Sequence, residues 1–183
     1  MILPQSNSFL IADPFLKDKS FLRSVVYLCL HNQEGSFGFT INKKTDYFLE
    51  DLMIDFDSLS IPVYAGGPVG TDTIHFLHQL PHLIPNSHKM NDNLYWGGDF
   101  DCVKELITAK KIDLSKIKFF IGYSGWSAGQ LANEIEEKSW LTSCADNDII
   151  FNSPDENIWR KSIKLLGPEF IELINYPIDP ELN

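Results

Sequence analysis

The sequence has 183 residues, of which 44% are apolar and 13% aromatic, which is the composition of a globular protein rather than a disordered one. Fifteen basic and 25 acidic residues give a net charge of −10, which repels nucleic-acid phosphates and argues against direct nucleic-acid binding. No repeat, low-complexity tract or linker divides the chain. We therefore expect a single domain over residues 1–183, large enough to bury a substantial core.

The cysteines and the N-terminus indicate the compartment. Cys29, Cys102 and Cys144 are far apart and lie outside any C-x-x-C pair, so they support neither a disulfide framework nor a zinc site. No basic segment precedes the first apolar residues, and no apolar run approaches the roughly 18 residues that span a bilayer. The sequence predicts a cytoplasmic protein without a membrane partner.

Strands are predicted throughout the first part of the chain. Apolar runs predict strands at 8–13, 24–31 and 36–42, and residues 32–35 between the last two are typical of a hairpin loop. A short amphipathic stretch follows at 48–54. The pattern up to this point is that of antiparallel strands joined by short turns.

The middle of the chain continues this pattern. Two further strands are predicted at 62–65 and 73–77, joined by the glycine-rich turn 66–70. Residues 80–92 contain two prolines and are interpreted as a loop, and another strand is predicted at 93–98. More strands are thus expected before the first long helix.

Helices are predicted mainly in the second half. Asp99 can cap a helix whose apolar residues recur at helical spacing, and 116–124 then has the composition of a buried strand. A last helix is predicted with Ser153 as N-cap, Glu156 completing a capping box and Gly167 as its C-terminal stop. Strands early and helices late favour an α+β fold of mainly antiparallel strands over a doubly wound parallel sheet.

The most distinctive stretch is GYSGWSAGQL at 122–131, because residues 125–129 match the G-x-S-x-G pattern of a nucleophile elbow after a strand. In that arrangement the catalytic histidine follows the serine, but all five histidines here precede Ser127. Triads also occur in other chain orders. A serine hydrolase that uses Ser127 or Ser124 with an upstream His75 or His78 is therefore the alternative function.

A second interpretation of the same stretch is a capped helix start. Ser127 and Gln130 have capping-box spacing, and Trp126 and Leu131 have the spacing of a hydrophobic staple. The unpaired N–H groups of a first helical turn suit a small anion. The candidate ligand-binding residues are Gly125, Trp126, Ser127, Gly129 and Gln130.

Arg23 is the remaining candidate ligand-binding residue. Its guanidinium could hold an anion through two parallel hydrogen bonds, although an ion pair with a nearby carboxylate is the common role of such an arginine. His75, His78 and His82 suggest a metal site, but residues three apart in a strand point to opposite faces, and Pro81 disfavours a helix. We expect no metal and no cofactor.

Five segments resemble, in order and spacing, those of the YqgE/AlgH family. They are FLIADPFLKDKSFLRSVVYLCLHNQEGSFGFTINK at 9–43, GGPVGTDTIHFLH at 66–78, LYWGGDFDCVKELI at 94–107, FIGYSGWSAGQL at 120–131 with SWL at 139–141, and IIFNSPDENIWRKSIKLLG at 149–167. Members of the family resemble one another over 122–131, but the residue at the position of Ser127 varies among them. An acidic residue is usual in the family where this chain has Ala132.

The resemblance implies a single α+β domain, a strand-rich pseudo-barrel with helices packed around it. Family members are labelled transcriptional regulators, and the family supplies no catalytic residues to transfer to this chain. The acidic balance and the lack of a recognition motif for DNA imply an indirect route. We therefore expect a non-enzymatic binding or regulatory domain whose partner is a small anionic ligand or a protein.

Overall fold

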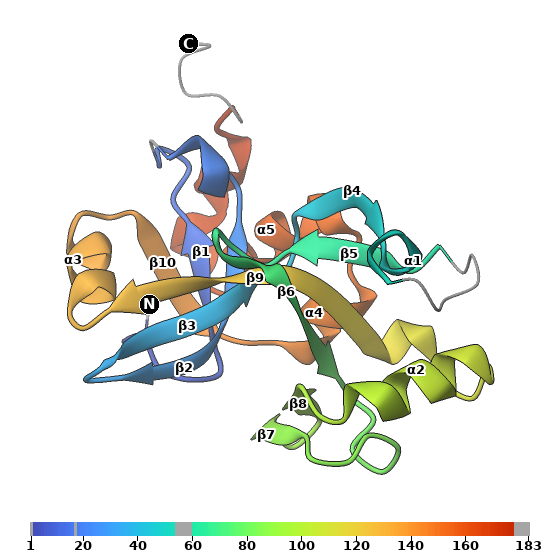
Figure 1. The fold of residues 1–183 in the computed structure, drawn as a ribbon. Helices are drawn as coiled ribbons and strands as arrows, with labels where there is room; N and C mark the ends of the chain where they lie inside the picture. The colour runs from blue at the N-terminus through green and yellow to red at the C-terminus, as the bar shows by residue number, and fades with distance from the viewer. Residues whose placement is uncertain (1, 17, 54–59, 178–183) are drawn as a thin grey trace.

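The computed structural model describes residues 2–16, 18–53 and 60–177. Its strands form a 10-stranded sheet (Figure 1). Eight of them pair in the order β10-β1-β2-β3-β9-β6-β8-β7; the other two are β5, which pairs with β9, and β4, which pairs with β5. The strands are β1 (Ser8–Ala12), β2 (Val25–Asn32), β3 (Gly35–Thr40), β4 (Lys44–Phe48), β5 (Pro62–Ala65), β6 (Val69–His78), β7 (His88–Asn91), β8 (Leu94–Trp96), β9 (Ile117–Ser127) and β10 (Trp140–Cys144).

Helices surround this sheet and confirm the α+β class (Figure 1). They are α1 (Leu49–Leu52), α2 (Phe100–Thr108), α3 (Gln130–Glu136), α4 (Asn147–Asn152) and α5 (Asp155–Lys164), together with the 3₁₀ segments η1 (Lys19–Phe21), η2 (Leu114–Lys116) and η3 (Pro168–Asn175). Within the described chain all strand pairs are antiparallel except β5 with β9. The sheet is not closed, because the path of pairing ends at β10 and β7.

Both faces of β1 and of residues 25–29 of β2 are buried, which explains their apolar sequences. Phe9 and Ile11 point into a core that also contains Trp159 and Ile163 of α5. Leu10, between them, points to the opposite face and joins a second core. Because neighbouring strand residues point to opposite faces, a strand covered on both sides needs apolar residues at every position.

A third core forms where α2 covers the other end of the sheet. Val103 and Ile107 of α2 pack with Phe76 of β6 and Phe119 of β9. The predicted cap of α2 is confirmed, since the carboxylate of Asp99 accepts a hydrogen bond from the N–H of the third following residue. Propensity, cap and apolar spacing all favour the same helix here.

The structure also corrects several predicted elements. Residues 80–92 are not all loop, because 88–91 form β7, which pairs with β8. Strand β10 and helix α4 were not predicted. Ser153 is not the N-cap of α5, which is Pro154. The Ser153 hydroxyl instead accepts a hydrogen bond from Lys161 Nζ at 2.9 Å. Of the amphipathic stretch at 48–54, residues 49–52 form α1, and residue 54 lies outside the described residues.

Two of the sequence predictions concern a membrane and a metal ion. In the described residues, no helix combines the length and the apolar composition required to cross a bilayer. Within the same residues, no three His, Cys, Asp or Glu side chains are grouped as metal ligands would be.

Candidate functional site

Strand β9 bends at Gly122, and the distinctive stretch 122–131 begins at this bend. Before it, β9 lies between β5, with Ala65 opposite Ile121, and β6. After it, β3 takes the place of β5, with Gly38 opposite Ser124, while β6 remains paired, with Val69 opposite Tyr123. Residues 70–73 of β6 bulge opposite Gly122, whose φ of 64° is in the left-handed region that favours glycine. The bend thus lets one strand change partners.

The predicted helix start lies later than the sequence suggested. The strand continues through Ser127, and the residue that precedes α3 is Gly129 with a φ of 76°. One half of the predicted capping box is present, because Gln130 Oε1 accepts a hydrogen bond from the Ser127 N–H at 3.0 Å. The Ser127 hydroxyl also donates to Gln130 Oε1, at 3.2 Å, instead of capping an N–H of the helix. The N-cap prediction for Ser127 was therefore wrong.

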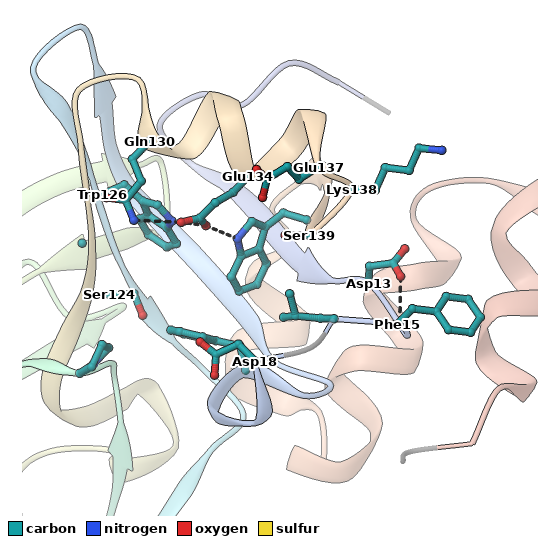
Figure 2. Close-up of a pocket in the computed structure, with 15 residues that line it drawn as sticks. Asp13, Phe15, Asp18, Ser124, Trp126, Gln130, Glu134, Glu137, Lys138 and Ser139 are labelled. Atoms are coloured by element: carbon teal, nitrogen blue, oxygen red, sulfur yellow. Dashed lines mark hydrogen bonds between the residues drawn. The ribbon is translucent and has the colours of Figure 1, made fainter. Parts of the chain in front are cut away.

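A carboxylate on α3 holds two tryptophans in place. Glu134 Oε2 accepts hydrogen bonds from the indole N–H of Trp126 and from that of Trp140, each at 2.8 Å. Its other oxygen accepts from the side-chain amide of Gln130 at 2.9 Å (Figure 2). The centroids of the two indole rings are 6.1 Å apart, and the rings are nearly perpendicular, with an interplanar angle of 83°. We call Trp126, Glu134 and Trp140 the Trp–Glu–Trp clamp.

The clamp forms one wall of a cavity of about 830 Å³, which we call the tryptophan cavity (Figure 2). The opposite wall consists of residues that follow β1, namely Asp13, Phe15, Leu16, Asp18 and Phe21. Four aromatic rings line the cavity, from Phe15, Phe21, Trp126 and Trp140. Four carboxylates also line it, from Asp13, Asp18, Glu134 and Glu137. Lys138 is the single basic residue among the described lining residues.

The structure brings three of the six predicted ligand-binding residues to this cavity and leaves Arg23 away from it. Gly125, Trp126 and Gln130 line the cavity, next to Ser127 and Gly129 in the chain. Arg23 instead donates to the backbone oxygens of Tyr176 and Pro177 at 2.6 and 2.9 Å. Its guanidinium also lies 3.8 Å from the ring centroid of Trp159. In the structure, Arg23 thus anchors the chain after η3.

Neither serine of the hydrolase alternative contacts a histidine in the described structure. The Ser124 hydroxyl is buried and donates to the backbone oxygen of Gly66 at 3.0 Å. His78 is also buried, with Nε2 3.0 Å from the Gly97 oxygen and Nδ1 accepting from the Leu80 N–H. Both ring nitrogens are therefore occupied, and burial lowers the pKa of His78 so that it remains neutral.

The other two histidines of this group, His75 and His82, differ in burial. His75 Nε2 is buried and has no hydrogen-bond partner in the described structure, and burial lowers the pKa of its ring. His82 is exposed. The expected mixture of core and surface histidines is what the structure shows.

The sequence model of the AlgH-like family matches residues 9–171. The chain belongs to the AlgH-like family. A relative named UPF0301 protein from Parabacteroides distasonis is 44% identical over 100% of this chain and 93% of its own. A second UPF0301 protein, from Bacteroides fragilis, is 40% identical with the same shares covered. The resemblance stated from the five sequence segments is confirmed.

Solved structures agree with the AlgH-like assignment. The solution structure of the AlgH protein from Pseudomonas aeruginosa is 32% identical, with a TM-score of 0.75 over 94% of each chain. A crystal structure of a protein from Corynebacterium diphtheriae has a TM-score of 0.77 over 94% of this chain and 93% of its own. Its sequence identity is 19%, so this second likeness shows the fold alone.

Replacing Ser127 by alanine should have little effect on this AlgH-like protein. The hydroxyl is exposed and bonds only to a neighbouring exposed side chain, so we expect the free energy of unfolding to change by less than about 0.5 kcal/mol. A fluorophosphonate probe should label neither Ser127 nor Ser124, which mass spectrometry of the folded protein can measure. Labelling that disappears in Ser127→Ala or Ser124→Ala would support the hydrolase alternative instead.

Sequence reasoning missed most of the residues that line the cavity. Glu134, Trp140 and the lining residues that follow β1 were not among the candidates for the site. Trp140 is 14 residues after Trp126 in the chain, yet strand pairing and α3 bring the two rings together. The one available signal was the tryptophan at 140 beside a predicted acidic helix.

Proposed function

We propose that this AlgH-like chain is a binding protein whose tryptophan cavity receives a positively charged side chain of a protein partner. The observation that supports this proposal is the lining of the cavity, in which four aromatic rings and four carboxylates meet a single described lysine. Cations bind favourably over aromatic faces, with about 0.5–2 kcal/mol for each well-placed contact. Carboxylates at the rim add Coulomb attraction and hydrogen-bond acceptors.

The charge of the whole chain supports the same kind of partner. A net charge of −10 raises the association rate of basic partners and repels acidic ones. The small anion expected from the sequence is less well supported, because α3 spans only Gln130–Glu136. Two carboxylates, from Glu134 within this short helix and Glu137 at its C-terminal end, also line the cavity and would repel an anion. A role in transcription would then act through the bound protein, without direct contact to DNA.

Titration with a tetra-arginine peptide tests the proposal. We expect the peptide to bind and to change the tryptophan fluorescence, with an affinity that falls as salt is added. The double variant Asp18→Asn, Glu137→Gln should bind at least about tenfold more weakly, because it removes two carboxylates from the cavity. Isothermal titration calorimetry provides the dissociation constants.

A matched control separates the cavity from the overall charge. Asp101→Asn with Glu105→Gln removes the same two charges from the exposed side of α2, and we expect it to leave the affinity nearly unchanged. Equal weakening by both double variants would mean that only net charge matters. Saturable binding of inorganic phosphate, with none of the peptide, would favour the small-anion site and refute our proposal.

A further inference from the structure

A second cavity, of about 370 Å³, lies on the other side of the sheet from the residues of the clamp and contains a buried amine. Lys118 extends into it from β9, and its side chain is 8% exposed. Tyr64 of β5 and Asp155 at the start of α5 line the same cavity. A lysine is rarely buried to this extent unless it is paired, so its contacts need to be accounted for.

The contacts of Lys118 hold the amine loosely. Its Nζ lies 3.4 Å from Asp155 Oδ1 and 3.4 Å from the backbone oxygen of Ile150. Both distances are at the long end for hydrogen bonds, whose usual N···O length is about 2.9 Å. The Tyr64 ring centroid is 3.8 Å from Nζ, and the Tyr64 hydroxyl donates to the other oxygen of Asp155 at 3.1 Å. Asp155 is thus oriented by Tyr64 while Nζ keeps room to move.

This environment favours the neutral amine. Burial lowers the pKa of Lys118 to about 8; the nearby Asp155 carboxylate opposes this shift, and the charge of Lys44 on β4 adds to it. Tyr64, on the facing strand, remains neutral, because burial and the Asp155 charge raise its pKa. Near pH 8 about half of the Lys118 amines are neutral, against less than about 1% for an ordinary lysine with a pKa near 10.4.

We propose that Lys118 is a nucleophilic amine that binds small carbonyl compounds as an imine in this cavity. The supporting geometry is an amine beside a carboxylate, inside a cavity large enough for a molecule of a few carbon atoms. Such a site does not depend on the tryptophan cavity, and the two can be tested separately. A neutral, desolvated lysine is the form that attacks carbonyl carbon in Schiff-base sites.

The reaction balances without an oxidant or a metal. The nitrogen lone pair of Lys118 forms a bond to the carbonyl carbon, the C=O π electrons move to oxygen, and Asp155 carries one nitrogen proton to this oxygen to give a carbinolamine. Asp155 then carries the second nitrogen proton to the new hydroxyl group, which leaves as water while the C=N bond forms. One amine and one aldehyde give one imine and one water.

The lining of the cavity indicates the class of carbonyl compound. Ile61, Leu114 and Phe151 provide apolar surface, and the hydroxyl groups of Ser60, Ser115 and Ser153 lie among them. Among the described lining residues Lys118 is the one base, and the Asp155 carboxylate beside it would repel a phosphate or carboxylate on the ligand. A short aliphatic aldehyde therefore fits better than an anionic keto acid.

The experiment uses butanal with sodium cyanoborohydride, which reduces an imine to a stable secondary amine. After brief treatment of the folded protein at pH 8, peptide mapping by mass spectrometry should find the butyl group mainly on Lys118. We expect labelling there at least about tenfold faster than at Lys116, a half-exposed lysine two residues earlier. Lys118→Met should remove this fast labelling and leave that of Lys116 unchanged.

Two outcomes would overturn the proposal. One is labelling spread over the exposed lysines with no excess at Lys118, and the other is an unlabelled Lys118. The variant Asp155→Asn gives a readout that a purely structural lysine would not provide. Because the Asp155 charge raises the Lys118 pKa, its removal should shift the midpoint of the labelling-rate profile to lower pH. A thermal melt of each variant confirms that the labelled protein was folded.

Discussion

Substitution of Gly122 by alanine should lower the free energy of unfolding by about 3 kcal/mol. The φ of 64° at this residue is unfavourable for any side chain, and a Cβ atom would lie 2.7 Å from the backbone oxygens of both Gly67 and Val69. These oxygens belong to the connection that leads into β6, so relief requires the backbone to move. Urea unfolding followed by circular dichroism measures the change.

Gly129 offers a matched control for this substitution. Its φ is 76°, but an added Cβ would meet no atom within 4 Å. Gly129→Ala therefore contains the conformational strain without the collision, and we expect a loss of only about 1 kcal/mol. If the two variants were equally stable, the bend in β9 would not be restricted by the neighbouring backbone, and our account of the partner change would be wrong.

The second large effect is expected for Glu134→Ala. The substitution leaves the indole N–H groups of Trp126 and Trp140 and the amide of Gln130 without their shared acceptor. Because the indole groups are largely shielded from water, we expect a loss of about 2–3 kcal/mol and a melting temperature lower by roughly 4–12 °C. Thermal unfolding monitored by tryptophan fluorescence measures this loss.

Glu136 on the same helix supplies the control. It is exposed and Glu136→Ala removes the same charge, so its effect should stay within about 0.5 kcal/mol. Glu134→Gln should fall between the two, because an amide oxygen can still accept from the indole groups. A Glu134→Ala protein as stable as Glu136→Ala would show that the clamp does not stabilise the fold.

The sequence predicted elements whose signal is local. Strand-like apolar patterns identified β1, β2 and β3, and Asp99 identified the start of α2. The short β7, with sequence HKMN, was missed because its residues are largely polar and it is a strand only through pairing with β8. The end of β9 was missed because the glycine and serine residues at 124–127 look like a turn, whereas pairing with β3 keeps them extended.

The tryptophan cavity could be predicted only in part, for a related reason. Trp126 and Gln130 were identified because they occur in one compact motif. Glu134 and Trp140 join them through hydrogen bonds that depend on how α3 packs, and no local pattern contains that information. No sequence pattern singled out Lys118, and only the fold buries its side chain beneath α4 and α5. Burial of an ionisable group is a tertiary property.

The position of β9 in the sheet has a consequence for synthesis on the ribosome. The partners of β9, which are β3, β5 and β6, are all synthesised before it and wait for it to complete their pairing. One edge of β1 similarly stays unpaired until β10 has been synthesised. The nascent chain therefore exposes unpaired apolar strands until more than half of it has been translated. Such intermediates form their contacts late and are prone to aggregate, so this fold places an early demand on chaperones.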